Sequence, residues 1–209
     1  MKIFILADMW QQEELLSGKN RTNDILLSDT LPPISELIKN DAIFILNDSW
    51  RTLNIQKIEA TPVFINCVTE TLSDLNLPEH VSRINAWPGF LQRASWEIAT
   101  KNFHAHADEA IALLGKKFLK VKDEPGLVAA RVISMIINEA FFAIDDEVST
   151  REEIDLAMKL GTNYPFGPFE WAKKIGIKNI YQLLQKLSEK DERYTPSPAL
   201  RHTYTQNID

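Results

Sequence analysis

The chain has 209 residues, 44% hydrophobic and 25% charged, which is ordinary for a globular protein of one large or two small domains. Its net charge of −6 argues against a nucleic-acid partner, because such partners require clustered Lys and Arg. All apolar runs are shorter than the roughly 18 to 20 residues of a membrane span, so we expect a cytoplasmic protein without a membrane segment. A single cysteine, Cys67, and four scattered histidines predict neither a disulfide nor a metal site.

The first part of the chain alternates between apolar runs and segments of helical pattern. The apolar runs predict buried parallel strands over 2–6, 24–27, 42–46 and 62–66. The helical patterns lie at 9–18, 32–40 and 50–60. This alternation predicts an α/β unit with right-handed crossovers. We therefore expect a short, doubly wound, Rossmann-like parallel sheet, whose ligand site lies beyond the carboxyl ends of the strands.

The turn after the first predicted strand reads "ADMWQQE" and contains no glycine. A dinucleotide site needs glycines there, so that backbone N–H groups can approach a pyrophosphate. Asp8 stands at the phosphate position and is expected to cap the helix, whose other end is marked by Gly18. Asp29 and Asp48 end the next two strands, and Asp29 alone is a candidate for binding a ribose hydroxyl. Because three carboxylates at one sheet edge repel a pyrophosphate, we expect no cofactor, NAD included.

The second part of the chain is helical. The segment 125–144 carries Arg131, Ser134 and Asn138 as a narrow polar stripe on an otherwise apolar helix. Such a helix is expected to be buried nearly all round, at the centre of a domain or of an interface. A capping box, formed by Ser149 with Glu152 or by Thr150 with Glu153, predicts the start of the next helix, and Gly161 its end.

A third helix is predicted to start at Pro168 and to stop at Gly176, followed by an amphipathic helix over 179–187. Residues 123–177, with Asp155-Leu-Ala-Met-Lys-Leu-Gly161 and then Pro165-x-Gly167-Pro168-x-Glu170, closely resemble the C-terminal domain of L-3-hydroxyacyl-CoA dehydrogenases. "PSPAL" at 196–200 extends the resemblance, and 106–126 continues it weakly upstream. We therefore expect two domains, a truncated Rossmann-like domain over 1–123 and a helical dimerisation domain over 124–209.

The resemblance implies an enzyme of fatty-acid or related acyl-CoA metabolism. In that family a Rossmann domain binds NAD, and the helical domain pairs two chains and closes the acyl-CoA cleft. The reaction needs a His base oriented by a Glu, because removal of the hydroxyl proton lets hydride leave for the nicotinamide.

Carried over residue by residue, this dyad is only half retained. Glu97 matches the orienting Glu, whereas the His position holds Asn85, and an amide does not accept a proton near neutral pH. Ala130 stands in place of the family's active-site Asn, and the Arg that follows is kept as Arg131. The strand-end serine falls ambiguously near 69–71. We expect Asn85, Glu97 and Ala130 to be remnants of the site, with an amide hydrogen bond between Asn85 and Glu97.

Other residues could supply a base or a pocket. His104 and His106 open a predicted helix, where exposed first-turn positions are the plainer interpretation, and the two remaining histidines fall in a loop and a tail. Tryptophans at 87, 96 and 171 are candidates for an acyl or adenine pocket, although aromatic side chains at such positions more often belong to the core.

Three hypotheses stay open at this stage. The first is a catalytically impaired member of the family that forms a homodimer and binds an acyl-CoA or a protein partner. The second is an active NAD-dependent 3-hydroxyacyl-CoA oxidoreductase with a variant site. The third is a structural or interaction protein that binds no CoA ester.

Overall fold

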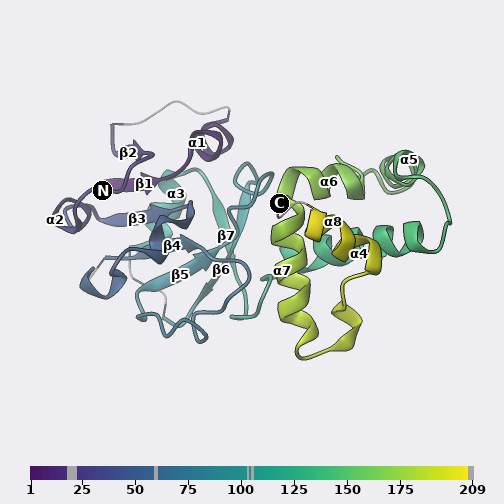
Figure 1. The fold of residues 1–209 in the computed structure, drawn as a ribbon. Coiled ribbons are helices and arrows are strands. Elements are labelled where there is room, and N and C mark those ends of the chain that lie inside the picture. The colour runs from purple at the N-terminus through teal and green to yellow at the C-terminus, as the bar shows by residue number, and fades with distance from the viewer. Residues whose placement is uncertain (18–22, 59–60, 103, 105, 207–209) are drawn as a thin grey trace. The chain divides into compact units, whose positions relative to one another are not determined.

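The structure, a computed structural model, describes residues 1–17, 23–58, 61–102, 104 and 106–206 (Figure 1). The chain forms two compact units, Met1–Leu127 and Val128–Asp209, named here the N-terminal and C-terminal units. This division falls just after the boundary predicted between residues 123 and 124. The reason is that Arg83 of the sheet binds the Asp123 carboxylate and the Glu124 carbonyl, which ties both residues to the N-terminal unit.

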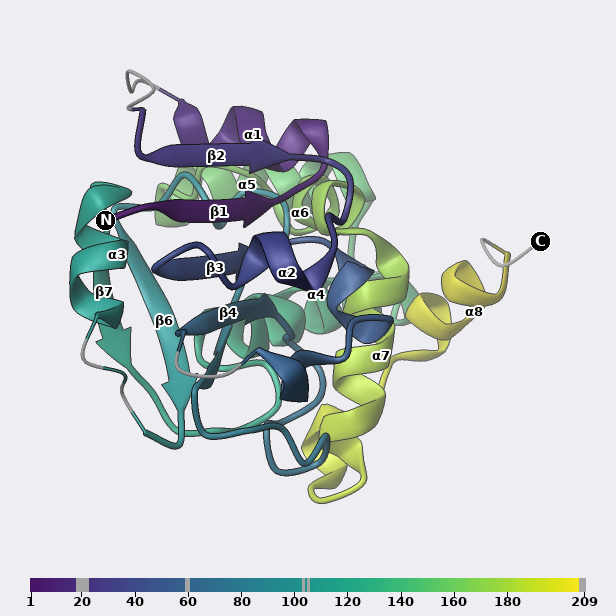
Figure 2. The same ribbon diagram turned by 90° about the vertical axis from the view of Figure 1, so that its left-hand side faces the viewer.

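The N-terminal unit contains one seven-stranded sheet with the order β2-β1-β3-β4-β5-β6-β7, seen face-on in Figure 2. Its strands are β1 (Ile3–Leu6), β2 (Ile25–Ser28), β3 (Ala42–Ile45), β4 (Val63–Asn66), β5 (Val81–Ile84), β6 (Ser95–Thr100) and β7 (Lys117–Lys120). All neighbours are parallel except β5 and β6. The four predicted strands and the Rossmann-like fold class are confirmed.

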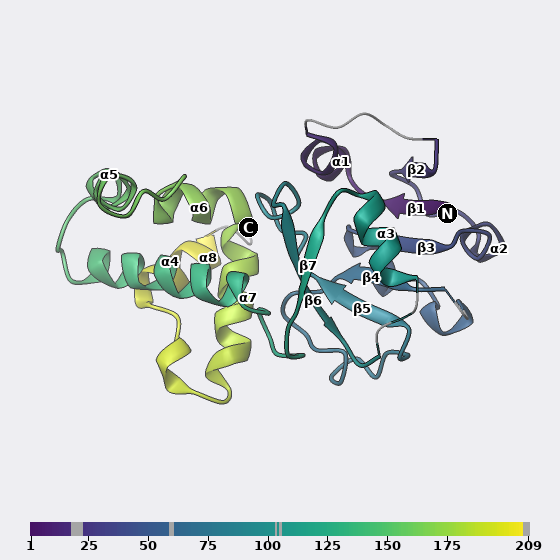
Figure 3. The ribbon, with the colours of Figure 1, turned by 180° about the vertical axis from the view of Figure 1, so that it is seen from behind.

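Helices cover both faces of this sheet, and each face has its own apolar core. The helical elements are α1 (Met9–Leu16), α2 (Ile34–Leu37), the 3₁₀ turns η1 (Asp48–Arg51) and η2 (Ile55–Lys57), and α3 (Ala107–Leu113). On one face Phe44 stacks on Phe64, with ring centroids 4.4 Å apart, beneath α1 and α3. Figure 3 shows α3 in front of this face. On the other face, α2 and the two 3₁₀ turns pack on the alternate side chains of the same strands.

The helix predicted over 50–60 is wrong within the described residues, which form η1 and η2 instead. Three apolar side chains of this segment, Trp50, Ile55 and Ile58, are all buried against the sheet. The Trp50 indole also donates to the Asn66 carbonyl at 3.0 Å, which fixes the first turn. The predicted cap residue Gly18 lies outside the described residues.

The C-terminal unit consists of helices packed around α4. They are α4 (Ala129–Asp145), α5 (Arg151–Thr162), α6 (Pro168–Ile175), α7 (Ile177–Ser188), the 3₁₀ turn η3 (Glu192–Tyr194) and α8 (Pro198–Gln206). Helix α4 contacts α5, α6, α7 and α8, as Figure 1 shows. Within the described part of the chain, no helix combines the length and the apolar character needed to cross a membrane.

The polar stripe of α4 faces inward, towards the segment that connects η3 with α8. Asn138 donates to the Thr195 carbonyl and accepts from the Ser197 N–H, both at 2.9 Å. The expectation that α4 is buried all round is wrong for this unit, because Val132 is 51% exposed. Its buried stripe and its open apolar stripe therefore lie on different faces.

The boundaries of α5 follow the capping chemistry. Of the two predicted capping boxes the structure forms that of Thr150 and Glu153, and the Ser149 hydroxyl adds a third bond to the same carboxylate at 2.6 Å. The helix does not end at Gly161 as predicted. Asn163 ends it in the left-handed conformation, with φ of 54°, which asparagine tolerates better than most residues.

Candidate functional site

Asn85 follows β5 at the carboxyl edge of the sheet and is only 7% exposed. Its Oδ1 accepts a hydrogen bond from the Trp87 backbone N–H at 3.1 Å, which fixes the orientation of the amide. The Nδ2 atom is buried and has no hydrogen-bond partner among the described residues. A buried donor without an acceptor is costly, so this N–H group is poised to donate to an acceptor that enters the site.

Glu97 lies on β6, the antiparallel neighbour of β5. The pairing of the two strands ends with Ile84 opposite Ile98, and Asn85 and Glu97 are the next residue of each strand beyond that pair. Residues opposite each other on such strands are side-chain neighbours. The expected Asn85–Glu97 hydrogen bond is nevertheless absent, because the amide nitrogen has no partner among the described residues. Glu97 instead acts on Arg93: burial lowers the pKa of the Arg93 guanidinium, and the charge of Glu97 opposes that change.

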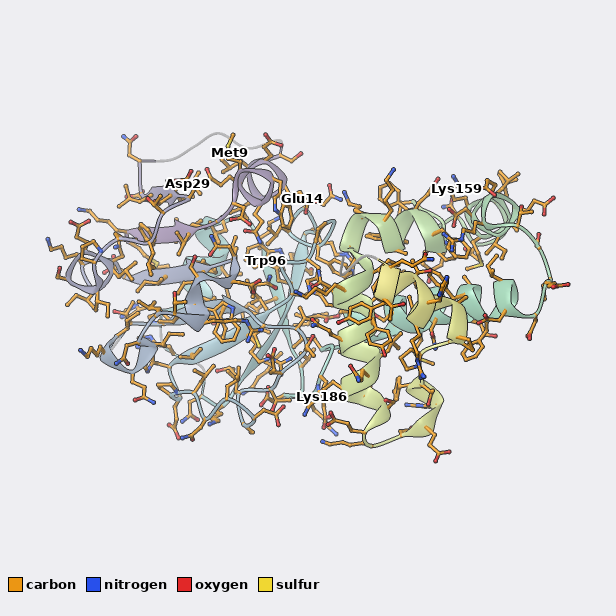
Figure 4. All side chains as sticks on the ribbon, viewed as in Figure 1. Met9, Glu14, Asp29, Trp96, Lys159 and Lys186 are labelled. Atoms are coloured by element: carbon orange, nitrogen blue, oxygen red, sulfur yellow. The ribbon has the colours of Figure 1, made fainter. Side chains whose placement is uncertain are left out.

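A tight turn closes this edge between β5 and β6. Gly89 has a φ of 90°, a conformation that favours glycine, and its N–H donates to both carboxylate oxygens of Glu14 at 2.7 and 2.9 Å. Figure 4 shows Glu14 on α1 and Trp96 on β6. The buried Lys116 donates to the carbonyls of Leu91 and Arg93 at 2.7 and 2.9 Å. Glu14 and Lys116 therefore stabilise the backbone of the turn through these hydrogen bonds.

None of the three histidines of the N-terminal unit lies at the same sheet edge as Asn85. His80 precedes β5 and Asn85 follows it, so five residue steps, about 16 Å, separate them. Thr100 at the end of β6 pairs with Ser82 near the start of β5, because the two strands are antiparallel. The segment that carries His104 and His106 therefore leaves the sheet at the edge where His80 lies. The fourth histidine, on α8, belongs to the C-terminal unit.

The sequence reasoning missed the main polar network of the N-terminal unit. Arg83 is fully buried, donates to Asp123 at 2.5 Å and to the Cys67 carbonyl at 2.9 Å, and also reaches the carbonyls of Val68 and Glu124 at 3.2 Å. The signal was a lone arginine inside a buried strand, which requires partners. Its role is to bind the loops after β4 and β7 to the sheet.

The segment after β4 offers no nucleophile. Burial raises the pKa of the Cys67 thiol to about 12, so the group stays protonated and unreactive. Thr71, near which the family serine was placed ambiguously, exchanges hydrogen bonds of 2.9 and 3.1 Å with Asp74 in a local turn. This segment is structural.

The crevice where the strand order reverses, between β1 and β3, is bridged by side chains. Asp8 is the N-cap of α1 as predicted, and its carboxylate accepts from the Asn47 amide at 3.2 Å. Gln11 donates to the Leu46 carbonyl at 2.6 Å and accepts from the Asp8 N–H at 3.0 Å. Asp29 is exposed after β2 (Figure 4). Asp29 stays a candidate for binding a ribose hydroxyl.

The signature of the C-terminal unit is a set of helix caps. The Asp155 carboxylate accepts from the N–H groups of Phe169 and Glu170 at 2.7 and 3.1 Å, so it caps α6 from the neighbouring helix. Glu170 in turn accepts from the Gly167 N–H at 2.9 Å and from Lys159 at 2.6 Å. A Cβ at Gly167 would collide with the Asp155 side chain, which explains the glycine. The signature therefore builds a fold and performs no reaction.

The remaining site candidates are core residues. Ala130 is fully buried in the first turn of α4, in the C-terminal unit. Trp87 and Trp96 are buried in the N-terminal unit and Trp171 in the C-terminal unit. The Trp96 indole donates to the Leu91 carbonyl at 3.2 Å. The three tryptophans thus pack in the interior of the two units.

Comparison with known proteins agrees with the signature. A family model described as the C-terminal domain of 3-hydroxyacyl-CoA dehydrogenase matches residues 126–207. Residues 126–207 thus form a C-terminal domain of the 3-hydroxyacyl-CoA dehydrogenase type. A 3-hydroxyadipyl-CoA dehydrogenase of Escherichia coli K12 is 43% identical over 89 residues, which are 42% of this chain and 19% of that protein.

The family likeness weakens in the N-terminal unit. A 3-hydroxybutyryl-CoA dehydrogenase of Clostridioides difficile is 28% identical over 179 residues, or 82% of this chain and 58% of that protein. The crystal structure of (S)-3-hydroxybutyryl-CoA dehydrogenase from Ralstonia eutropha has a TM-score of 0.72 at 23% identity, covering 88% of this chain and 71% of that one. The chain thus spans 19% of the Escherichia coli relative and 58% of the Clostridioides difficile relative, less than two thirds of each. The likeness to the crystal structure shows a shared fold.

The relatives also correct the expectation that no cofactor is involved. They are named dehydrogenases, and a dehydrogenase passes hydride to a cofactor, so a cofactor is expected for the family that the C-terminal unit matches. The residues fit such a group unevenly. Asp29 suits a ribose, whereas Asp8 and its hydrogen bond from Asn47 fit a pyrophosphate poorly.

Proposed function

We propose that this chain is a catalytically impaired member of the 3-hydroxyacyl-CoA dehydrogenase family, which binds a CoA ester without efficient turnover. The observation that carries the proposal is Asn85, a buried amide at the position of the family's base. A base must accept the hydroxyl proton, and an amide does not do so near neutral pH. The described histidines of the N-terminal unit lie at the edge of the sheet opposite to that of Asn85.

The unpartnered Nδ2 of Asn85 gives this site a binding chemistry in place of the lost acid–base chemistry. An amide N–H donates well to a carbonyl oxygen, and a CoA thioester or its 3-keto group supplies one. Binding would give the buried donor a partner and remove the cost of leaving it without one. The charge of Glu97 acts on Arg93, and no imidazolium is there for it to stabilise. The site is thus suited to hold a substrate and unsuited to oxidise it.

The test is the oxidation of NADH in the presence of acetoacetyl-CoA, compared with one of the named relatives measured in parallel. Loss of a general base costs about 10²–10⁴-fold in rate, so we expect the wild-type rate to lie lower by that factor. Asn85→His should raise kcat by about 10²-fold, because the register places Glu97 beside the new imidazole. Adding Glu97→Gln to Asn85→His should remove most of that gain.

Two controls separate impairment from misfolding and from the other functions. Glu97→Gln alone should leave the wild-type rate unchanged, because no imidazolium is there to stabilise. Calorimetry with acetoacetyl-CoA should detect binding to the wild type. A wild-type rate equal to that of the relative would establish an active oxidoreductase instead, and absence of binding would leave a structural or interaction protein.

We also propose that the chain forms a homodimer in the cytoplasm through its C-terminal unit. The support is a set of exposed apolar side chains on and before α5, with Val148 70%, Leu156 54% and Leu160 78% exposed. Clustered apolar exposure of this kind marks interaction surfaces. Leu160→Glu should convert the dimer to a monomer in light scattering, with Glu152→Lys as an exposed control on the same helix. A wild-type monomer would contradict this part of the proposal.

A further inference from the structure

The C-terminal unit contains a pocket that the family signature does not use. Its volume is ≈ 540 Å³, within the range of about 300–1,000 Å³ typical of small-molecule sites. The apolar wall includes Phe141 and Phe169, whose rings make an edge-to-face contact at 5.0 Å, and Ile177 at the start of α7. All its lining residues lie within the one unit, on or next to α4, α5, α6, α7 and α8.

Three cationic side chains line the same pocket. They are Arg151 at the start of α5, Lys173 on α6 and Lys178 on α7. The Arg151 guanidinium carbon lies 5.4 and 5.3 Å from the ring centroids of Phe141 and Phe169, which holds it above the apolar wall.

Within the described part of the chain, no negative charge compensates these three groups. No acidic residue is among the described residues that line the pocket, and no ion pair of the described chain includes any of the three cations. Neighbouring lysines are paired: Lys159 with Glu170 at 2.6 Å and Lys186 with Glu189 at 3.1 Å. In a chain of net charge −6, a pocket with only positive charge calls for an anion.

We infer that this pocket binds an organic phosphate with a flat, apolar body, of which a nucleotide is the model compound. A phosphate carries about −1.5 to −2 charges near neutral pH, which suits three cations better than a single carboxylate does. Arginine donates to phosphate in a bidentate manner, and lysines add point charges. The two phenyl rings provide the surface for the body of the ligand. The inference is independent of the function proposed for Asn85.

The experiment is a calorimetric titration of the full chain with ADP. We expect one site in the C-terminal unit, with weaker binding as salt is raised, because salt screens exposed charges. Arg151→Gln and Lys173→Gln should each weaken ADP binding about tenfold or more, as the loss of a charge-assisted hydrogen bond predicts. Adenosine, which lacks the phosphates, should bind at least about tenfold more weakly for the same reason.

A matched variant locates the site. Lys186→Gln removes the same charge from α7 outside the pocket (Figure 4) and should leave the affinity for ADP unchanged. The inference is overturned if ADP does not bind, if Arg151→Gln and Lys173→Gln both leave its affinity unchanged, or if decanoate binds the pocket and ADP does not. It is equally overturned if Arg151→Gln changes the oligomeric state and leaves ADP affinity intact.

Discussion

The two units of this chain have kept different parts of their family's residues. In the C-terminal unit the signature is complete, and each member has a geometric role, since Asp155 caps α6, Gly167 makes room for it, and Glu170 completes the capping box. In the N-terminal unit, Asn85 stands where the resemblance predicts the base, and the turn after β1 holds Asp8. The network around Arg83, which only supports the fold, is well formed there.

This contrast separates stability from chemistry. Residues that cap helices or compensate buried charge are needed for folding whether or not a reaction takes place. Residues that move protons are needed only for the reaction. A strong match over helix-capping residues therefore identifies a fold and a family, and it carries no information about catalysis in the other unit.

The largest expected effect is on the N-terminal unit. Arg83→Ala should lower the free energy of unfolding by about 3–5 kcal/mol, because it leaves the partly buried Asp123 without its partner. Arg51→Ala, which breaks the more exposed pair with Glu70, is the matched control and should cost about 1 kcal/mol or less. Urea denaturation measures both. Equal effects of the two variants would show that the buried network does not hold the unit together.

A smaller effect is expected at the signature of the C-terminal unit. Asp155→Ala should cost about 2–3 kcal/mol, because two N–H groups of α6 lose their acceptor. Gly167→Ala should also destabilise, since its Cβ would meet the Asp155 side chain. In the double variant the collision is gone, so the second substitution should add almost nothing. Strictly additive effects in urea denaturation would contradict the capping role.

The smallest effect concerns the pH dependence of stability. The hydrogen bond from Lys159, and then that from the Gly167 N–H, lowers the pKa of Glu170 below its ordinary value of 4.5. A lowered pKa stabilises the folded state above the ordinary value, and the contribution is lost as the pH falls through the folded value. Between about pH 6 and pH 3, the Tm of Glu170→Gln should therefore decline less than that of the wild type. If the Tm of the wild type and that of Glu170→Gln decline equally over this pH range, Glu170 makes no such contribution.

Much of the fold could be predicted from the sequence because its signals are local. The alternation of apolar runs with helical patterns predicts parallel strands, and cap residues such as Thr150 and Pro168 mark helix starts. The prediction failed over 50–60, where burial of Trp50 and Ile55 on the sheet overrides helical propensity. It failed again at the end of α5, where Asn163 adopts the left-handed conformation in place of a glycine cap.

The sequence by itself determined the resemblance of the C-terminal unit and the strands of the sheet, because each depends on residue type and spacing. Only the tertiary structure decided how the polar residues are partnered. The Nδ2 of Asn85 has no acceptor among the described residues, and Arg83 joins loops that are far apart in the chain. The pocket beside Arg151 likewise gathers residues from five helices. Such contacts depend on long-range packing, which no local pattern encodes.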